Sequence, residues 1–276
     1  MVDDRVLAGF AALLEETTGL RTPESNRSHL KRVIVREVRA RSVAPDRLLS
    51  SCRRDTHLLQ EIVDAAMIGE TYFFREVAHF RYLQSAVLPA VAPEQREIVA
   101  WSASCSTGEE AVSLAAVLDQ FRRSGAVKTA TVYASDIRSD MVDRIRRGVY
   151  PLSSLRRDGE EFHELLRRFY VSETDARSMT ISKELRDVIR PATINLFTDS
   201  LDGIPNDLDV VFFRNTLIYA PSENRDSIIA RIVAKIRPGG YLFLANSELP
   251  FIRHPELVIE EGAGTYCLRR VVVPDA

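Results

Sequence analysis

The sequence predicts an α/β protein with a mostly parallel sheet, preceded by an all-helical region. Two observations support this class. From residue 97 onward, short apolar runs alternate with helical stretches, whereas the first 90 or so residues show helical spacing without such runs. Strands that alternate with helices are joined by right-handed crossovers, which produce a parallel sheet.

The helical region has two stretches in which apolar residues recur at helical spacing. They are Leu7, Phe10, Leu13 and Leu14, followed by Leu30, Val33, Ile34 and Val38. Breaks are expected at Pro45–Asp46 and between Pro89 and Pro93. We take the second break as a domain boundary, so that a helical domain covers residues 1–90 and an α/β domain covers residues 91–276.

The α/β part can be divided into elements along the chain. The expected strands are residues 97–103, 129–135, 209–213, 241–245 and 265–268, the expected helices are residues 106–121, 140–147 and 222–236, and Pro238–Gly240 is an expected turn. A segment at about residues 150–192 interrupts this alternation with a short helix and two β-like pieces, residues 178–181 and 188–189. It predicts a small inserted β-subdomain.

Composition excludes several classes. A chain of 276 residues with 45% hydrophobic and 28% charged residues is neither disordered nor a disulfide-stapled miniprotein. A net charge of −2 argues against a general nucleic-acid binder. The three cysteines show no zinc-ligand spacing, so no metal is expected, and no apolar run approaches the ~20 residues that span a bilayer. We expect a cytoplasmic protein that does not insert into membranes.

Ligands of open parallel sheets bind at the carboxyl ends of the strands. Polar groups follow the predicted strands at five places: Ser104–Glu110, Asp136, Asn195–Leu196, Arg214–Asn215 and Asn246–Glu248. These positions are the candidate site.

The segment Ser106–Glu110 has two interpretations. Ser106 with Glu109, and Thr107 with Glu110, have capping-box spacing, and on spacing alone a plain helix cap is favoured. In the alternative, Gly108 allows a ligand to approach the backbone. Two carboxylates at this helix start would repel a phosphate, and the three-glycine dinucleotide fingerprint is absent.

Asp136 closes the second predicted strand, 28 positions after Gly108. An acid at this position can accept hydrogen bonds from both ribose hydroxyls of an adenosine, although it can also be an exposed helix cap. Taken with the first loop, it favours a nucleoside without phosphates. S-adenosylmethionine, with its ribose, amino-acid tail and sulfonium, fits this description.

Six segments then occur in one order along nearly the whole chain: Thr71–Arg75 (TYFFR), Trp101–Glu110 (WSASCSTGEE), Gly148–Ser153 (GVYPLS), Asn195–Leu196, Phe213–Tyr219 (FRNTLIY) and Pro238–Leu244 (PGGYLFL). In this order they resemble the CheR-type chemoreceptor glutamate O-methyltransferases. The resemblance implies a receptor-docking helical domain, a Rossmann-like class I methyltransferase sheet and an inserted β-subdomain. It also implies S-adenosylmethionine-dependent methylation of chemoreceptor glutamates in chemotaxis adaptation.

The resemblance implies roles for individual residues. Cofactor contacts would come from Thr71, Arg75, Glu109, Asp136, Asn195, Leu196, Asn215 and Thr216. Among these, Asp136 would hold the ribose and Glu109 would contact the amino-acid end of the cofactor. Arg75 and Tyr219 would face the reacting groups in the active site.

This sequence departs from the family pattern at Gly69, Ser104, Ala111–Val112 and Leu249. The departures leave open an alternative, a catalytically impaired relative that serves as a cofactor-binding docking module. A cysteine hydrolase built on Cys105 is a weaker alternative, because the glycines of a nucleophile elbow and a partner histidine are missing. The inserted segment has no glycine between Tyr170 and Pro191, so we do not expect it to grip a receptor tether peptide.

Methylation of a glutamate needs no general base, because the carboxyl group, with a reference pKa of ~4.3, is already ionised near neutral pH. In agreement, none of the five histidines follows a predicted strand. Alignment of the reactants in a water-poor site would lower the barrier, and Arg75 would orient the acceptor carboxylate through two parallel hydrogen bonds.

Arg32, Arg36 and Arg39 lie at helical spacing and form one cationic helix face. Such a face can simply be solvated, or it can bind an acidic protein helix or nucleic acid. The absence of interleaved aromatic residues disfavours nucleic acid. Because the resemblance implies acidic methylation helices in the receptor, we expect this face to dock an acidic helical bundle of the methyl-accepting chemotaxis receptor. We expect the protein itself to be a monomer.

Overall fold

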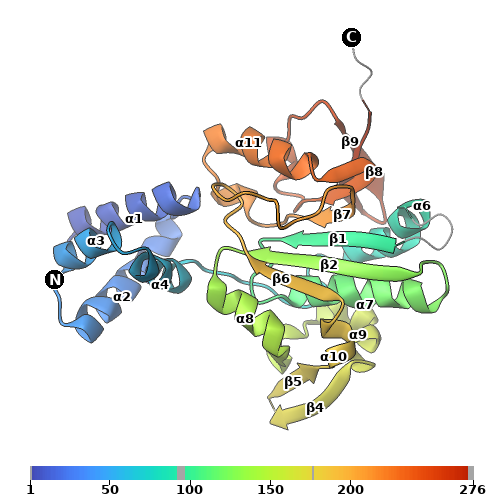
Figure 1. Cartoon of the computed structure of the whole chain (residues 1–276), viewed down its shortest axis with the longest axis horizontal. Helices are drawn as coiled ribbons and strands as arrows, with labels where there is room; N and C mark the ends of the chain where they lie inside the picture. The colour runs from blue at the N-terminus through green and yellow to red at the C-terminus, as the bar shows by residue number, and fades with distance from the viewer. Residues whose placement is uncertain (1, 92–96, 176, 273–276) are drawn as a thin grey trace.

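A computed structural model describes residues 2–91, 97–175 and 177–272 of the chain. Four helices at the N-terminus form a separate unit, which an extended linker, residues 67–76, joins to a larger α/β part (Figure 1). The predicted break between Pro89 and Pro93 lies partly outside the described residues.

The four helices of the N-terminal unit are α1 (Asp4–Thr18), α2 (Glu24–Arg41), α3 (Pro45–Cys52) and α4 (Thr56–Ala66). Asp3 caps α1 by accepting a hydrogen bond from the Val6 amide (2.9 Å). Pro45 begins α3 at a position where its missing N–H costs nothing. The apolar faces that the sequence predicts pack together around Phe10 and Ile34, so the helical region is confirmed.

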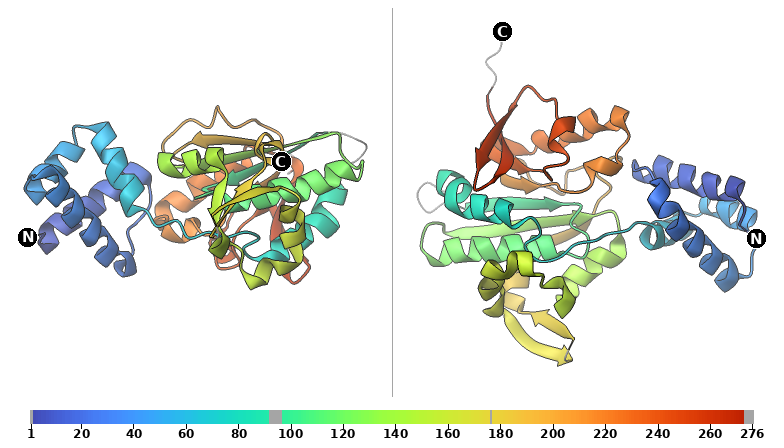
Figure 2. Two further views of the ribbon diagram at one scale, coloured as in Figure 1. Left: turned by 90° about the horizontal axis from the view of Figure 1, so that it is seen from below. Right: turned by 180° about the vertical axis from the view of Figure 1, so that it is seen from behind.

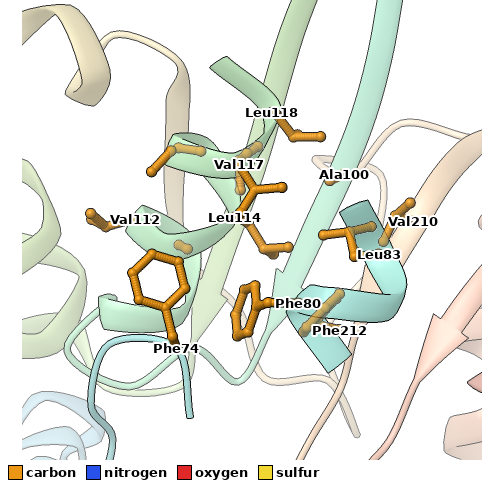
Figure 3. Close-up of a cluster of buried hydrophobic side chains, with 14 of the residues drawn as sticks. Phe74, Phe80, Leu83, Ala100, Val112, Leu114, Val117, Leu118, Val210 and Phe212 are labelled. Carbon is orange, nitrogen blue, oxygen red and sulfur yellow. The ribbon is translucent and has the colours of Figure 1, made fainter. Parts of the chain in front are cut away.

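The later helices before the sheet pack elsewhere. They are α5 (Val77–Tyr82), a π-helical turn (Leu83–Val87) and α6 (Leu88–Val91). Phe80 and Leu83 belong to the core of the α/β part (Figure 3) and are not members of the helical core around Phe10 and Ile34. By packing, the helical unit therefore ends near Met67 and not at residue 90. The physical reason is the aromatic partners of Phe80, whose ring centroid lies 5.2 Å from that of Phe74 and 5.4 Å from that of Phe212.

The main sheet has seven strands: β1 (Glu97–Ala103), β2 (Thr129–Asp136), β6 (Ile189–Thr193), β7 (Leu208–Phe212), β8 (Ile236–Phe243), β9 (Leu257–Gly262) and β10 (Thr265–Arg270). Their order is β6-β2-β1-β7-β8-β10-β9. The first five run parallel, and β10 pairs antiparallel with both β8 and β9. The predicted mostly parallel α/β sheet is confirmed.

Helices cover both faces of the sheet: α7 (Glu109–Arg123), α8 (Ser139–Arg147) and α11 (Ser222–Val233). Alternate residues of β7 point to opposite faces. Val210 and Phe212 join the core that contains α7, whereas Val211 joins the core that contains α11 (Figure 3). Burial on both faces explains why this strand is a continuous apolar run.

Three details differ from the expected elements. The helix expected from residue 106 begins at Glu109, because Ser106 and Gly108 have φ of 51° and 94°. The expected turn Pro238–Gly240 lies inside β8 as a bulge: between the pairs Leu208–Ile236 and Val210–Tyr241, one residue of β7 faces four of β8. Strand β9 is not predicted; its largely exposed residues lack the apolar alternation of a half-buried strand.

The insertion contains β3 (Val149–Pro151), β4 (Tyr170–Asp175) and β5 (Ser178–Ile181), with helices α9 (Glu160–Arg167) and α10 (Lys183–Arg186). The strands form an antiparallel sheet of order β3-β5-β4, which projects from one edge of the molecule (Figures 1 and 2). Residues 189–192, which we expected inside this insertion, belong to β6 and pair with β2. The edge of β2 needs a partner for its ladder, so the chain returns to the main sheet there.

Candidate functional site

A cavity of about 330 Å³ opens at the carboxyl ends of β1, β2 and β7, and the linker closes its other side. Its size falls at the lower end of small-molecule sites. Its lining includes six of the residues chosen from the sequence: Thr71, Arg75, Asp136, Asn215, Thr216 and Tyr219. The parallel sheet places the candidate site where its topology requires.

The backbone around this cavity is held in unusual conformations. Among the described residues, eight non-glycine residues have positive φ. Five of them lie at the cavity or beside its lining: Phe74, Glu76, Ser104, Ser106 and Asn215. Such conformations cost free energy and concentrate at functional sites. They indicate loops that the fold holds in a set shape.

Asp136 ends β2 and is largely buried in the cavity wall. Its Oδ2 accepts from the Ser106 amide (2.8 Å) and its Oδ1 from the Arg138 amide (3.0 Å). Burial raises the pKa of this carboxyl group, and the two amide hydrogen bonds oppose that rise. Each oxygen has a second lone pair, so the carboxylate has the acceptor capacity for two ribose hydroxyls.

The first loop does not form the capping box that its spacing suggests. Gly108 occupies the N-cap position without a side-chain hydrogen bond, and the Ser106 hydroxyl donates to the Gly69 carbonyl (3.0 Å). Glu109 accepts from Thr107 and from Ser154 (2.9 Å). Burial raises the pKa of Glu109, and its side chain is not part of the cavity lining. The geometry therefore does not support its predicted contact with the cofactor.

A buried ionic network lies beside the cavity. Arg214 Nε donates to Glu110 Oε2 (2.8 Å), and the Ser102 hydroxyl donates to Glu110 Oε1 (2.6 Å). Arg214 Nη1 also donates to the Arg75 carbonyl (2.7 Å). A buried guanidinium needs such partners, because an unpaired charge there is costly.

His79 belongs to the same network, and its Nδ1 lies 3.1 Å from Arg214 Nη1. Since a guanidinium only donates, Nδ1 accepts and the ring proton is on Nε2. Burial, with Arg214 adding to it, lowers the pKa of His79 to about 3. The ring is neutral near pH 7. Nothing in the sequence around His79 signals this role, because Arg214 lies 135 positions away.

Glu248 organises the loop that follows β7. This fully buried carboxylate accepts from the amides of Asn215 (2.9 Å), Ala245 (3.0 Å) and Ile218 (3.3 Å). Burial raises its pKa, and the amide hydrogen bonds act against that rise. Glu248 thereby positions the loop that carries Asn215, Thr216 and Tyr219. From the sequence, Glu248 is recognisable only as an acidic residue that follows a predicted strand, and its hydrogen-bond partners are not.

Asn195 and Leu196 lie outside the cavity lining. Asn195 Nδ2 donates to the Thr17 carbonyl (2.7 Å), and its Oδ1 accepts from the Phe197 amide (3.0 Å). Leu196 is buried in the core beneath α11. In this structure Asn195 joins α1 to the sheet, and the predicted cofactor contacts of Asn195 and Leu196 have no support from the geometry.

Arg75 comes from the linker and is half-buried in the cavity wall. Its Nη1 donates to the Glu70 carbonyl (2.7 Å). This uses one of the five N–H donors of the guanidinium. The helical unit also borders the cavity, through Leu20 and Asn26.

A second candidate surface lies on α2. Arg32, Arg36 and Arg39 are exposed and border one open groove together with Lys31 and Val35. The structure therefore brings together the three arginines chosen for substrate docking.

Comparison with known proteins shows to which family the chain belongs. Residues 69–264 match the family model described as CheR methyltransferase, SAM binding domain. The chain belongs to the CheR methyltransferase family. S-adenosylmethionine is its cofactor, and Asp136 with its open lone pairs suits the ribose of that group.

Individual members of the family resemble the chain over most of its length. The chemotaxis protein methyltransferase Cher2 of Pseudomonas putida is 33% identical over 69% of this chain and 70% of its own. A chemotaxis protein methyltransferase of Vibrio parahaemolyticus is 30% identical over 90% of both chains. Among solved structures, PKMT2 from Rickettsia typhi in complex with AdoHcy aligns at a TM-score of 0.38 and 9% identity, over 64% of this chain and 26% of its own.

One departure from the CheR pattern has a local explanation. A Cβ at Gly69 would lie 2.3 Å from Ser106 Oγ, so a larger residue at 69 would force the Ser106 hydroxyl out of its present position. Ser104 has a φ of 59°, a conformation in which glycine is favoured. Val112 (Figure 3) and Ala111 are buried in the core, and both lie outside the cavity lining.

The remaining classes receive no support. Cys105 is buried, and burial raises the pKa of its thiol well above the ordinary value, which disfavours the thiolate of a hydrolase. In the described part of the chain, no three His, Cys, Asp or Glu side chains are arranged to hold a metal ion. Within residues 2–91, 97–175 and 177–272, no helix has both the length and the apolar character needed to cross a bilayer.

Proposed function

We propose that this CheR-family methyltransferase transfers the methyl group of S-adenosylmethionine to glutamate side chains of chemoreceptors. One observation carries the proposal: Asp136, from the sheet, and Arg75, from the linker, border the same cavity. A carboxylate suited to ribose hydroxyls and a guanidinium suited to a carboxylate are thus brought together. The names of the relatives, chemotaxis protein methyltransferases, support the chemoreceptor as substrate.

The cofactor, when bound, supplies an electrophilic methyl group on a sulfonium. Asp136 would hold its ribose, while Thr71, Asn215 and Thr216 supply further polar groups in the lining. Tyr219 would form part of the wall near the acceptor. Two hydrogen bonds hold the backbone of these loops in the absence of ligand: the Asn215 amide donates to Glu248, and Arg214 donates to the Arg75 carbonyl.

The acceptor carboxylate would be oriented by Arg75 through a two-point hydrogen bond. It is ionised near neutral pH and needs no base. His79 is not suited to act as a general base, because burial and the neighbouring Arg214 keep its ring neutral and its Nδ1 already accepts from Arg214. Catalysis would then rest on alignment within a water-poor site, where neutralisation of carboxylate and sulfonium charge is favoured.

Docking would use α2. Its exposed Arg32, Arg36 and Arg39 present positive charge around one open groove, which suits an acidic helical bundle of the receptor. We assign receptor docking to the helical unit and methyl transfer to the α/β part on this basis.

The experiment is methyl transfer from labelled S-adenosylmethionine to receptor-containing membranes. We expect label on the receptor that is released as methanol by mild base, since a glutamate methyl ester is base-labile. Binding of S-adenosylhomocysteine without any base-labile label would favour the docking module instead. Base-stable label would show a methyl acceptor other than a carboxylate.

A further inference from the structure

The linker that carries Arg75 has two sides. On one side, Glu70, Thr71 and Arg75 line the cofactor cavity. On the other, the same segment contacts residues 150–162 of the insertion, some 80 positions later in the chain.

Four polar side chains make the outer part of this contact. Arg156 Nη2 lies 2.8 Å from Glu70 Oε1, and the Arg156 guanidinium lies 4.1 Å from the Tyr72 ring centroid. The Tyr72 hydroxyl donates to Asp158 Oδ2 (2.8 Å). We call Glu70, Tyr72, Arg156 and Asp158 the rim clamp. Its link to the active site is short, because the Glu70 carbonyl accepts from Arg75 Nη1 (2.7 Å).

An apolar base lies beneath the rim clamp. Phe73 packs edge-on against Tyr150 (ring centroids 5.2 Å apart), and Phe74 stacks on Phe162 (5.1 Å). The Phe73 amide donates to the Ser154 carbonyl (3.0 Å). Since this base is buried and independent of the clamp side chains, substitutions in the exposed clamp leave the fold in place.

We propose that the rim clamp positions Arg75 for methyl transfer, so that the insertion serves as the outer support of the active site. Arg156 acts through Glu70, while the Tyr72 ring lies 5.9 Å from the Arg75 guanidinium, so both are positioning residues. The proposal rests on the proposed function, in which Arg75 orients the acceptor carboxylate. A guanidinium that swings freely loses the alignment on which transfer between two bound groups depends.

A direct contact between Arg156 and an acidic substrate is the competing explanation. Asp158 separates the two. If Arg156 simply attracted an acidic partner, removal of the neighbouring negative charge in Asp158→Ala would leave methylation unchanged or lower its KM. If the clamp positions Arg75, Asp158→Ala lowers kcat, because the Tyr72 hydroxyl loses its partner.

The test measures kcat and KM for receptor methylation, and the Kd for S-adenosylhomocysteine, in Arg156→Ala, Arg156→Lys, Tyr72→Ala and Asp158→Ala. Arg157→Ala is the matched control, since Arg157 is an exposed neighbour outside the clamp contacts. We expect kcat to fall about tenfold in Arg156→Ala and Tyr72→Ala, with KM and Kd within about twofold. Arg156→Lys keeps the charge and should recover part of kcat.

Hydrogen exchange of residues 68–76 supplies a readout that needs no turnover. We expect faster exchange in Arg156→Ala than in Arg157→Ala. A wild-type protein that forms no methyl ester while Arg156→Ala still exchanges faster would remove the proposed function but keep the support role of the clamp. Unchanged kcat and exchange in both Arg156→Ala and Tyr72→Ala, in an active enzyme, would overturn the clamp.

Discussion

The cavity and the α2 face are built in opposite ways. Around the cavity, Asp136, Glu110 and Glu248 are buried, and each accepts at least two hydrogen bonds from fixed donors. On α2, Arg32 and Arg39 are exposed, and Arg36 pairs with its neighbour Glu37 (2.9 Å). The first region is preorganised, whereas the second presents mobile charge to a partner.

This difference has consequences that can be measured. Removal of one side chain from a preorganised, buried site removes strong hydrogen bonds and leaves its buried donors or acceptors without a partner. Removal of an exposed charge mainly changes encounter and salt dependence. Each prediction below tests one side of the contrast.

The largest effect is expected at Asp136. Asp136→Ala removes the acceptor for two charge-assisted hydrogen bonds, each worth about 1.5–3 kcal/mol. We therefore expect the affinity for S-adenosylhomocysteine to fall by about 100-fold or more in calorimetry. Asp143→Ala, an exposed acid paired with Arg146, is the control and should bind normally. Equal affinities of both variants with wild type would refute the ribose assignment.

The α2 face is expected to show the next effect. Charge reversal of Arg32, Arg36 and Arg39 to Glu should lower receptor methylation about tenfold at low salt, because acidic surfaces then repel. The Kd for S-adenosylhomocysteine should not change. For the wild type, methylation should fall as salt rises, while the triple variant shows little salt dependence. Undiminished methylation by the variant at low salt would place the docking face elsewhere.

His79 provides a pH test of the buried network. Its folded-state pKa of about 3 lies below its ordinary value of 6.5. Between these pH values the unfolded chain binds a proton that the folded protein does not. The free energy of unfolding contributed by His79 therefore falls on acidification through this window, by up to about 1.4 kcal/mol per pH unit.

Denaturant unfolding at pH 4.5–6.5 measures this slope. His79→Gln should show a shallower dependence than wild type, because glutamine does not titrate. The raised pKa values of Asp136, Glu109 and Glu248 act with the opposite sign, but they are present in both proteins. His57→Gln, at an exposed histidine, is the control. Identical slopes for wild type and His79→Gln would show that the ring titrates freely.

The smallest effect is expected in the strained first loop. Ser104→Gly relieves a non-glycine residue at a φ of 59° and should raise the free energy of unfolding by about 0.5–1 kcal/mol. Thermal unfolding checks this. Destabilisation would mean that the serine side chain contributes more than its backbone conformation costs.

The sequence was most informative where one local signal determines an element. Strand β1 matches its expected range, and β2 extends one residue beyond its own, because apolar runs bounded by polar residues leave few alternatives. Asp136 and Asn215 could be chosen as site residues for a topological reason, since each follows a parallel strand. The order of the six segments indicates the CheR family, and the family model over residues 69–264 confirms it.

Local signals failed where distant segments compete for the same atoms. The spacing of Ser106 and Glu109 fits a capping box. In the structure, however, the Ser106 hydroxyl donates to the Gly69 carbonyl, and the Glu109 carboxylate accepts from the Ser154 hydroxyl. Asn195 was expected in the cofactor site, yet its side-chain amide donates to the Thr17 carbonyl. Residue spacing within a segment carries no information about a hydrogen-bond partner in a distant segment. These hydrogen bonds could therefore not be predicted from the sequence.

By itself, the sequence determined the α/β class, the family, and which strand ends carry polar groups. These depend on periodicity and on residue order, which are properties of neighbouring residues. Only the tertiary structure decided that Phe80 packs with the sheet, that Arg214 joins His79 to Glu110, and that the insertion contacts the Arg75 linker. Those contacts join residues up to 135 positions apart, and their free energy depends on burial and hydrogen-bond geometry that exist only once the chain has folded.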